Sequence, residues 1–103
     1  MNKLEKDIER KLRIMVERRG GLCLKWVCPG WSGVPDRIVL LPGGRVIFVE
    51  TKRPAGGRLS ALQRWWFEQL RRLGFKVVSV WNVEDINRLE LYIYEKKLEA
   101  SDE

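Results

Sequence analysis

Residues 33–52 read Gly-Val-Pro-Asp-Arg-Ile-Val-Leu-Leu-Pro-Gly-Gly-Arg-Val-Ile-Phe-Val-Glu-Thr-Lys. Two apolar runs of strand length flank the turn residues 42–44, and this pattern predicts a β-hairpin. A hairpin places the start of its first strand beside the end of its second. Asp36 and Glu50 are therefore expected to face each other across the ladder, within one residue of register.

The carboxyl end of the second strand is expected to carry a charged face. Residues two apart on a strand share a face, so Glu50 and Lys52 point the same way, while Thr51 is expected to point away from the site they form. Two adjacent carboxylates repel each other unless a cation lies between them. Oxygen ligands suit Mg²⁺, which commonly binds one or two carboxylates together with substrate phosphate. Lys52 would orient a water or stabilise developing phosphorane charge.

Each of these residues also has an ordinary structural interpretation. Glu50 and Lys52 can form an exposed salt bridge, worth about 0–1 kcal/mol. Asp36 can be a turn residue after Pro35. The metal-site interpretation is preferred because all three residues occur together on one hairpin.

Pro35-Asp36 followed by Glu50-Thr51-Lys52 resembles the motif of the PD-(D/E)xK nuclease superfamily. The flanking sequence is most similar to its virus-type replication-repair nuclease (VRR-NUC) branch. That similarity is carried by Gly33-Val34-Pro35-Asp36, by Glu50-Thr51-Lys52-Arg53-Pro54 and by Arg58-Leu59-Ser60-Ala61-Leu62-Gln63. It covers roughly residues 4–90. The resemblance implies an α/β fold with a restriction-endonuclease-like core, a mixed β-sheet flanked by helices, and Mg²⁺-dependent hydrolysis of DNA, with Mn²⁺ able to substitute.

The resemblance also implies further site residues. In this family a glutamate on the first helix completes the metal site, and the match is Glu5, with Glu9 as the alternative. As structural alternatives, Glu5 could form a capping box with Asn2 or a surface pair with Lys6, and Glu9 could pair with Arg13 along the helix surface. The backbone carbonyl of Thr51 is implied as a further metal ligand. Gln63 is implied to reach the site, or else to form a capping box with Ser60, and one rotamer is not expected to do both.

The remaining pattern predicts one domain over residues 1–103, in the order α-β-β-β-α-β-α. Helices are expected over 3–19, 59–73 and from 82 to 91, with further strands at 22–28 and 76–81. The tail from Tyr92 either extends the last helix or adds a strand, and residues 99–103 are expected to be disordered. The second helix is expected to bury Leu59, Leu62, Trp66, Leu70 and Leu73, and to leave Trp65 and Phe67 half exposed as a possible partner surface.

Composition limits the possible functions of the chain. The 103 residues include no histidine, which excludes histidine acid–base chemistry, and no Walker loop, so no nucleotide cofactor is expected. A net charge of +6 favours a polyanionic partner. No apolar run reaches the roughly 18 residues that span a membrane, so a cytoplasmic protein is expected, including a phage-encoded one acting in its host's cytoplasm. Cys23 and Cys28 are expected to be reduced, buried thiols.

Four residues are candidate DNA contacts beside the predicted site: Arg53, Arg58, Lys25 and Trp31. Trp31 either stacks on an unpaired base or packs back on the sheet. A small domain has little surface for reading base sequence, so branched DNA such as a Holliday junction is the preferred substrate, and its symmetry predicts a homodimer. The alternatives are a non-catalytic nucleic-acid-binding module of a replication or repair assembly, and a structural or toxin–antitoxin partner.

Overall fold

The structure of the protein is a computed structural model that describes residues 3–52 and 58–101, with the side chains of 3–5 and 98–101 outside the description. Its elements follow the predicted order. They are α1 (Lys3–Arg18), β1 (Leu22–Lys25), β2 (Arg37–Leu41), β3 (Arg45–Thr51), α2 (Ala61–Arg72), β4 (Lys76–Val80) and α3 (Val83–Ser101). The predicted α/β class is confirmed, and none of the described helices is long and apolar enough to cross a membrane.

The four strands form one mixed sheet in the order β1-β2-β3-β4. The first three strands are antiparallel, and β4 runs parallel to β3 after the crossover through α2. In the hairpin Arg37 lies opposite Val49, so the next residues outward, Asp36 and Glu50, come together as predicted. Both Gly43 and Gly44 have positive φ, which the tight turn between these strands requires.

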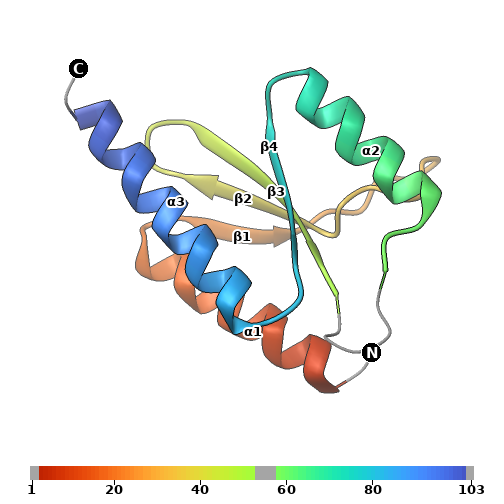
Figure 1. Cartoon of the computed structure of the whole chain (residues 1–103), viewed down its shortest axis with the longest axis horizontal. Helices are drawn as coiled ribbons and strands as arrows, with labels where there is room; N and C mark the ends of the chain where they lie inside the picture. The colour runs from red at the N-terminus through yellow and green to blue at the C-terminus, as the bar shows by residue number, and fades with distance from the viewer. Residues whose placement is uncertain (1–2, 53–57, 102–103) are drawn as a thin grey trace.

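Helices cover the two faces of the sheet unequally (Figure 1). On one face α1 and α3 pack against each other and against the sheet, enclosing the larger core around Leu12, Val39 and Ile93. On the other face α2 covers mainly β3 and β4, and a smaller core forms around Phe48 and Phe67. The side chains of β3 therefore alternate between two cores, which is why this strand is apolar on both faces before it reaches Glu50.

The burial of α2 differs from the prediction. Phe67 is buried together with Leu70, whereas Leu62 and Leu73 are exposed and Trp66 is half-buried. The prediction is confirmed for Leu70 but was wrong for Leu62, Phe67 and Leu73, which corresponds to about one residue of helix rotation. Periodicity marks an apolar stripe, but α2 turns its Gln63–Phe67–Leu70 edge toward the sheet.

Other boundaries also depend on tertiary contacts. β1 ends at Lys25 rather than at residue 28, after which the Trp26 N–H makes one more bond, to the Asp36 carbonyl at 2.8 Å. The tail from Tyr92 extends α3, which continues through Ser101, so the expectation of disorder is wrong for residues 99–101. Asn82 caps this helix by accepting the Asp85 N–H at 2.9 Å, as expected from its position.

The turn between α1 and β1 makes one position intolerant of any side chain. A Cβ at Gly21 would lie 2.4 Å from the Leu40 carbonyl oxygen and 2.9 Å from the Leu41 side chain. We expect Gly21→Ala to lower the free energy of unfolding by about 2–3 kcal/mol, because backbone must move to relieve the overlap. Urea unfolding midpoints at constant m-value measure this loss.

Gly30→Ala is the matched control for Gly21→Ala. Gly30 has φ +86°, and a Cβ there would meet nothing within 4 Å, so only the conformational cost of about 1–2 kcal/mol is expected. Equal losses in the two variants would contradict the close approach of the α1–β1 turn to β2.

Candidate active site

The two predicted carboxylates meet where β3 ends. The Asp36 N–H donates to Glu50 Oε1 at 3.1 Å, and the Thr51 N–H donates to Asp36 Oδ1 at 2.9 Å. Each carboxylate is therefore fixed by a backbone amide of the other strand. The Lys52 N–H donates to the Val80 carbonyl at 2.9 Å, which also ties the end of β3 to β4.

Glu50 is the buried centre of one half of the site. It is only 6% exposed, and Oε2 lies 3.5 Å from Lys52 Nζ and 2.8 Å from Gln63 Nε2. Glu50 and Lys52 share a face of the sheet, as the strand alternation predicts. Their side chains are 8% and 17% exposed, which does not fit the alternative of an exposed surface salt bridge.

A single rotamer of Gln63 both completes the capping box of α2 and binds Glu50 in the site. Its Oε1 accepts the Ser60 N–H at 2.8 Å, and its own N–H donates to Ser60 Oγ at 3.1 Å. Its Nε2 remains available and donates to Glu50. The expectation that one rotamer cannot do both was wrong, because an amide carries an acceptor and a donor on opposite sides. The cap therefore positions the amide for Glu50.

Asp36 joins the other half of the site, on the α1 face of the sheet. The chain bends at Asp36 before β2 begins, and this bend turns its carboxylate toward Thr51, whose hydroxyl donates to Oδ2 at 2.6 Å. Thr51 does project to the opposite face from Glu50, as expected. The prediction that its side chain would therefore point away from the site was wrong.

The helix carboxylate that the structure places in this half is Glu9. Its Oε1 lies 3.3 Å from the Thr51 hydroxyl, and its Oε2 accepts from Arg37 Nη2 at 3.1 Å. Glu9 was the alternative to Glu5 in the sequence analysis. The side chain of Glu5 lies outside the described residues, so its role stays a prediction.

Burial and nearby negative charge make both carboxylates reluctant to ionise. Burial, together with the nearby charge of Asp36, raises the pKa of Glu50 to about 7, although Lys52 acts in the opposite direction. Burial also raises the pKa of Asp36, against the two hydrogen bonds from Thr51. A cation held between the two would relieve this cost.

The donor set fits a hard divalent cation. Both carboxylates offer oxygen ligands, and each oxygen that accepts a hydrogen bond keeps a second lone pair. Among the described residues no three His, Cys, Asp or Glu side chains are grouped as a ready-made metal site. A cation here would therefore need water, backbone or substrate oxygens besides the Asp36 and Glu50 carboxylates, which is the usual manner of Mg²⁺.

Three of the four predicted DNA contacts lie among the described residues, and all three are exposed. Lys25 ends β1 opposite Arg37, and both Lys25 and Arg58 are exposed. Trp31 is 61% exposed and meets Trp66 of α2 edge-on at 5.7 Å, so it packs on a helix and not on the sheet. Arg53 lies outside the described residues.

Sequence reasoning did not single out Arg37. Its side chain pairs with Glu9, and the two are 18% and 13% exposed. Its Nε is buried without a hydrogen-bond partner among the described residues. The available signal was its position, directly after the Asp of the motif and at the start of a strand whose face is otherwise apolar.

The cysteines take no part in this chemistry. Both are free thiols, Cys23 buried as predicted and Cys28 only half-buried, where the prediction was wrong. Burial raises the pKa of the Cys23 thiol to about 11, so its nucleophilic thiolate is essentially absent at neutral pH.

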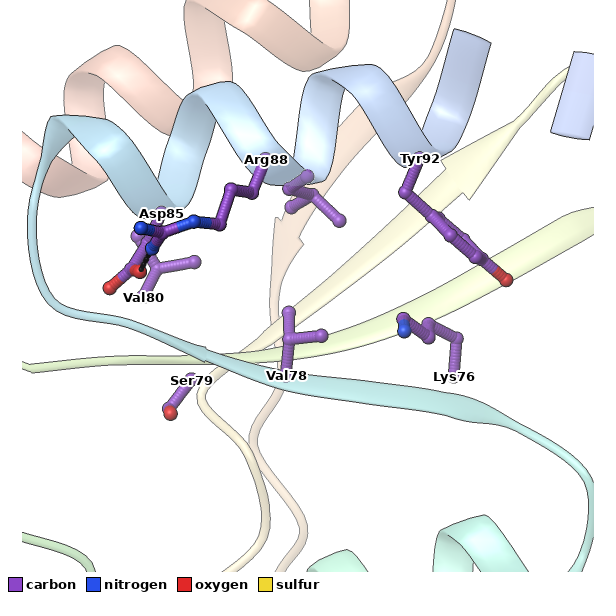
Figure 2. A pocket seen from close by; sticks show the side chains of 8 residues that line it. Lys76, Val78, Ser79, Val80, Asp85, Arg88 and Tyr92 are labelled. Carbon is purple, nitrogen blue, oxygen red and sulfur yellow. Dashed lines mark hydrogen bonds and ion pairs between the residues drawn. The ribbon is translucent and has the colours of Figure 1, made fainter. Parts of the chain in front are cut away.

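A separate small hollow lies between β4 and α3, with a volume of about 190 Å³ (Figure 2). The charged groups that line it are engaged with their neighbours. Arg88 reaches back to Asp85 at 2.9 Å, and Lys76 Nζ lies 4.4 Å from the Tyr92 ring centroid. The hollow is lined by none of Asp36, Glu50, Lys52 and Gln63, so we do not assign it to the candidate site.

The cap of α2 gives a test of how Gln63 is positioned. We expect Ser60→Ala to cost about 1 kcal/mol of unfolding free energy, because it removes the N-cap acceptor. Ser60→Asp keeps an N-cap acceptor and should restore stability. Chemical denaturation of the two variants beside the wild type measures both effects. Equal stability of Ser60→Ala and wild type would contradict the cap.

Comparison with known proteins gives consistent matches. A family model described as the VRR-NUC domain matches residues 5–85. A solved structure described as a VRR_NUC domain is 30% identical, covers 85% of this chain and 95% of its own, and has a TM-score of 0.81. A curated relative from Acyrthosiphon pisum secondary endosymbiont phage 1, named "Putative nuclease p44", is 43% identical over 74 residues, or 72% of this chain and 78% of that protein.

Proposed function

The chain belongs to the VRR-NUC domain family, and from this membership we propose that it is a Mg²⁺-dependent, structure-selective endonuclease that cuts branched DNA such as Holliday junctions. One observation supports the chemistry most directly. At the end of β3 the half-buried Asp36 lies beside the buried Glu50, and the Lys52 ammonium lies 3.5 Å from Glu50. Two adjacent carboxylates with raised pKa values form a site that a cation would stabilise.

In this proposal Asp36, Glu50 and the Thr51 carbonyl hold Mg²⁺, with Glu5 or Glu9 contributing through water. Bound Mg²⁺ would lower the pKa of a water and neutralise charge on the scissile phosphate. Lys52 positions the attacking water or stabilises the negative charge of the pentavalent phosphorane. Gln63 fixes Glu50 in its rotamer through the 2.8 Å hydrogen bond that Gln63 Nε2 donates to Glu50 Oε2.

A homodimer is part of the proposal, because a four-way junction presents two equivalent strands to two equivalent sites. One uncovered apolar surface supports it. α2 leaves the β1–β2 end of its face of the sheet bare, where Leu22, Leu24 and Leu40 are 54%, 44% and 37% exposed. Leu22 and Leu40 lie opposite each other in register, so they form a continuous strip on one face. Sedimentation equilibrium at micromolar concentration should show a dimer, and Leu40→Lys should make it a monomer.

The function is tested by offering labelled four-way junction, flap and linear duplex DNA, each with Mg²⁺ and with EDTA. We expect paired, symmetric nicks in the junction with Mg²⁺ and none with EDTA. Cutting of the flap alone would keep the nuclease and discard the preference for junctions. Tight binding without cutting in Mg²⁺ or Mn²⁺ would support the non-catalytic binding module instead.

A further inference from the structure

A hollow lined by aromatic side chains lies where the loop 29–35 meets the first half of α2. It has a volume of about 560 Å³ and is lined by Trp31, Ala61, Leu62, Trp65 and Trp66. We refer to these five residues as the tryptophan shelf. None of them belongs to the chemical site described above, and a cluster of three indoles at the surface of a 103-residue protein is costly unless something covers it.

The rings of the tryptophan shelf are held in place before any ligand arrives. Trp66 is half-buried, and its Nε1 donates to the Ser32 carbonyl at 2.9 Å, which ties the loop to α2. Trp31 and Trp65 meet Trp66 at 5.7 and 5.2 Å, with interplanar angles of 83° and 87°. Both rings therefore touch Trp66 edge-on, and with 61% and 45% of their surface exposed they keep aromatic area free.

The loop that carries Trp31 is fitted closely to the helix. A Cβ at Gly33 would lie 2.6 Å from Leu62 Cγ, so any other residue here would force the Leu62 side chain to move away from the loop. Gly33 also has φ +87°, a conformation that other residues adopt at a cost. The hollow is therefore a built feature of the loop–helix contact.

The tryptophan shelf is continuous with the candidate active site through one turn of α2. Leu62 directly precedes Gln63. Trp66 follows Gln63 by three residues, so the side chains of Trp66 and Gln63 are neighbours on the helix surface. Gln63 in turn binds Glu50 at 2.8 Å. Arg58 lies three residues before α2, and Arg64 lies in its first turn. Both side chains are exposed and supply positive charge for a phosphate backbone.

We propose that the tryptophan shelf stacks an unpaired nucleobase of the DNA, next to the phosphodiester that is cut. This inference rests on the proposed function in that DNA is taken as the substrate. Exposed indole faces beside arginines suit a base and its phosphate, because every base has a π-face and stacking needs no particular sequence. A second copy of the chain has a better-matched surface in the purely aliphatic strip of Leu22, Leu24 and Leu40. Among branched DNAs the tryptophan shelf thus favours those with single-stranded nucleotides beside the cut, such as a flap, over a fully paired four-way junction.

The test uses Lys52→Ala protein with Mg²⁺, so that DNA binds without being cut, and flap DNA carrying 2-aminopurine at successive unpaired positions. We expect quenching of the 2-aminopurine at one or two positions near the branch. Trp31→Leu and Trp65→Leu should abolish this quenching and weaken flap binding by about 5- to 150-fold. Affinity for fully paired duplex should stay unchanged.

Two controls separate stacking from folding. Trp65→Phe keeps an aromatic face and should retain the quenching. Tyr94→Leu removes an aromatic side chain that is 46% exposed on α3 and should change nothing. Flap affinity and quenching that survive both shelf substitutions would overturn the proposal. So would a wild-type dimer that Trp31→Leu or Trp65→Leu converts to a monomer, because the shelf would then join copies of the chain.

The outcome can be read separately from that of the proposed function. Binding and quenching need no cleavage, so a wild-type protein that cuts no DNA overturns the nuclease chemistry and leaves the stacking result intact. Conversely, wild-type cutting of branched DNA together with unquenched 2-aminopurine would overturn the shelf alone.

Discussion

Asp36→Asn is expected to slow DNA cleavage by more than about 1,000-fold, and Lys52→Ala by about 100- to 1,000-fold. The asparagine keeps an oxygen to accept the Thr51 N–H that now binds Asp36 at 2.9 Å, so the local fold should survive. It removes the negative charge that would hold a cation. The alanine removes the ammonium that lies 3.5 Å from Glu50.

Single-turnover cleavage with protein in excess over labelled DNA measures these rates without product release. Glu17→Gln is the matched control, since this glutamate forms an exposed pair with Arg13 on α1 and lies away from the site. Its rate should equal that of the wild type. Near-normal cutting by Asp36→Asn would place the chemistry elsewhere in the molecule. Wild-type affinity for DNA in both slow variants is needed to show that catalysis, not binding, was lost.

The metal-free protein is expected to lose about 3 kcal/mol of stability as pH rises from about 4 to about 8. The pKa of Glu50 is raised from 4.5 in an unfolded chain to about 7 in the folded protein. Between these values the folded state binds more protons at Glu50 than the unfolded state does, so the contribution of Glu50 to stability is fully present below pH 4.5 and is lost as pH rises through 7. The raised pKa of Asp36 acts in the same direction.

Urea unfolding in EDTA across this pH range measures the slope. Glu50→Gln cannot ionise at this position and should flatten it. Adding Mg²⁺ above pH 7 should restore stability to the wild type, because a ligand that binds only the folded state stabilises it. Stability that is constant or rising with pH in EDTA would contradict the buried position of Glu50.

The hairpin carries most of what sequence alone could establish. The turn at residues 42–44 and the two apolar runs set the register, and the register sets the meeting of Asp36 with Glu50. These are local relations, so periodicity and turn chemistry determine them. Lys52 follows from strand alternation alone.

What sequence could not establish depends on how separate elements rotate against one another. Residues on the first helix that border one apolar stripe look alike, so Glu9 is distinguished only by where α1 lies on the sheet, beside Thr51 and Arg37. The rotation of α2 that buries Phe67 and exposes Leu62 is likewise determined by packing against the sheet. The bend at Asp36, which carries its carboxylate to the α1 face, breaks the strand alternation that the prediction assumed.

Gln63 both caps α2 and binds Glu50, so a substitution at this position must satisfy two separate requirements. Capping boxes accept glutamine and glutamate almost interchangeably, so helix formation alone would treat an exchange between them as neutral. Here a glutamate would still cap α2 but would direct a second carboxylate, without a donor, at Glu50. A change of one functional group, silent for folding, would therefore disturb the site. The position tolerates the change as a helix cap and does not tolerate it as a partner of Glu50.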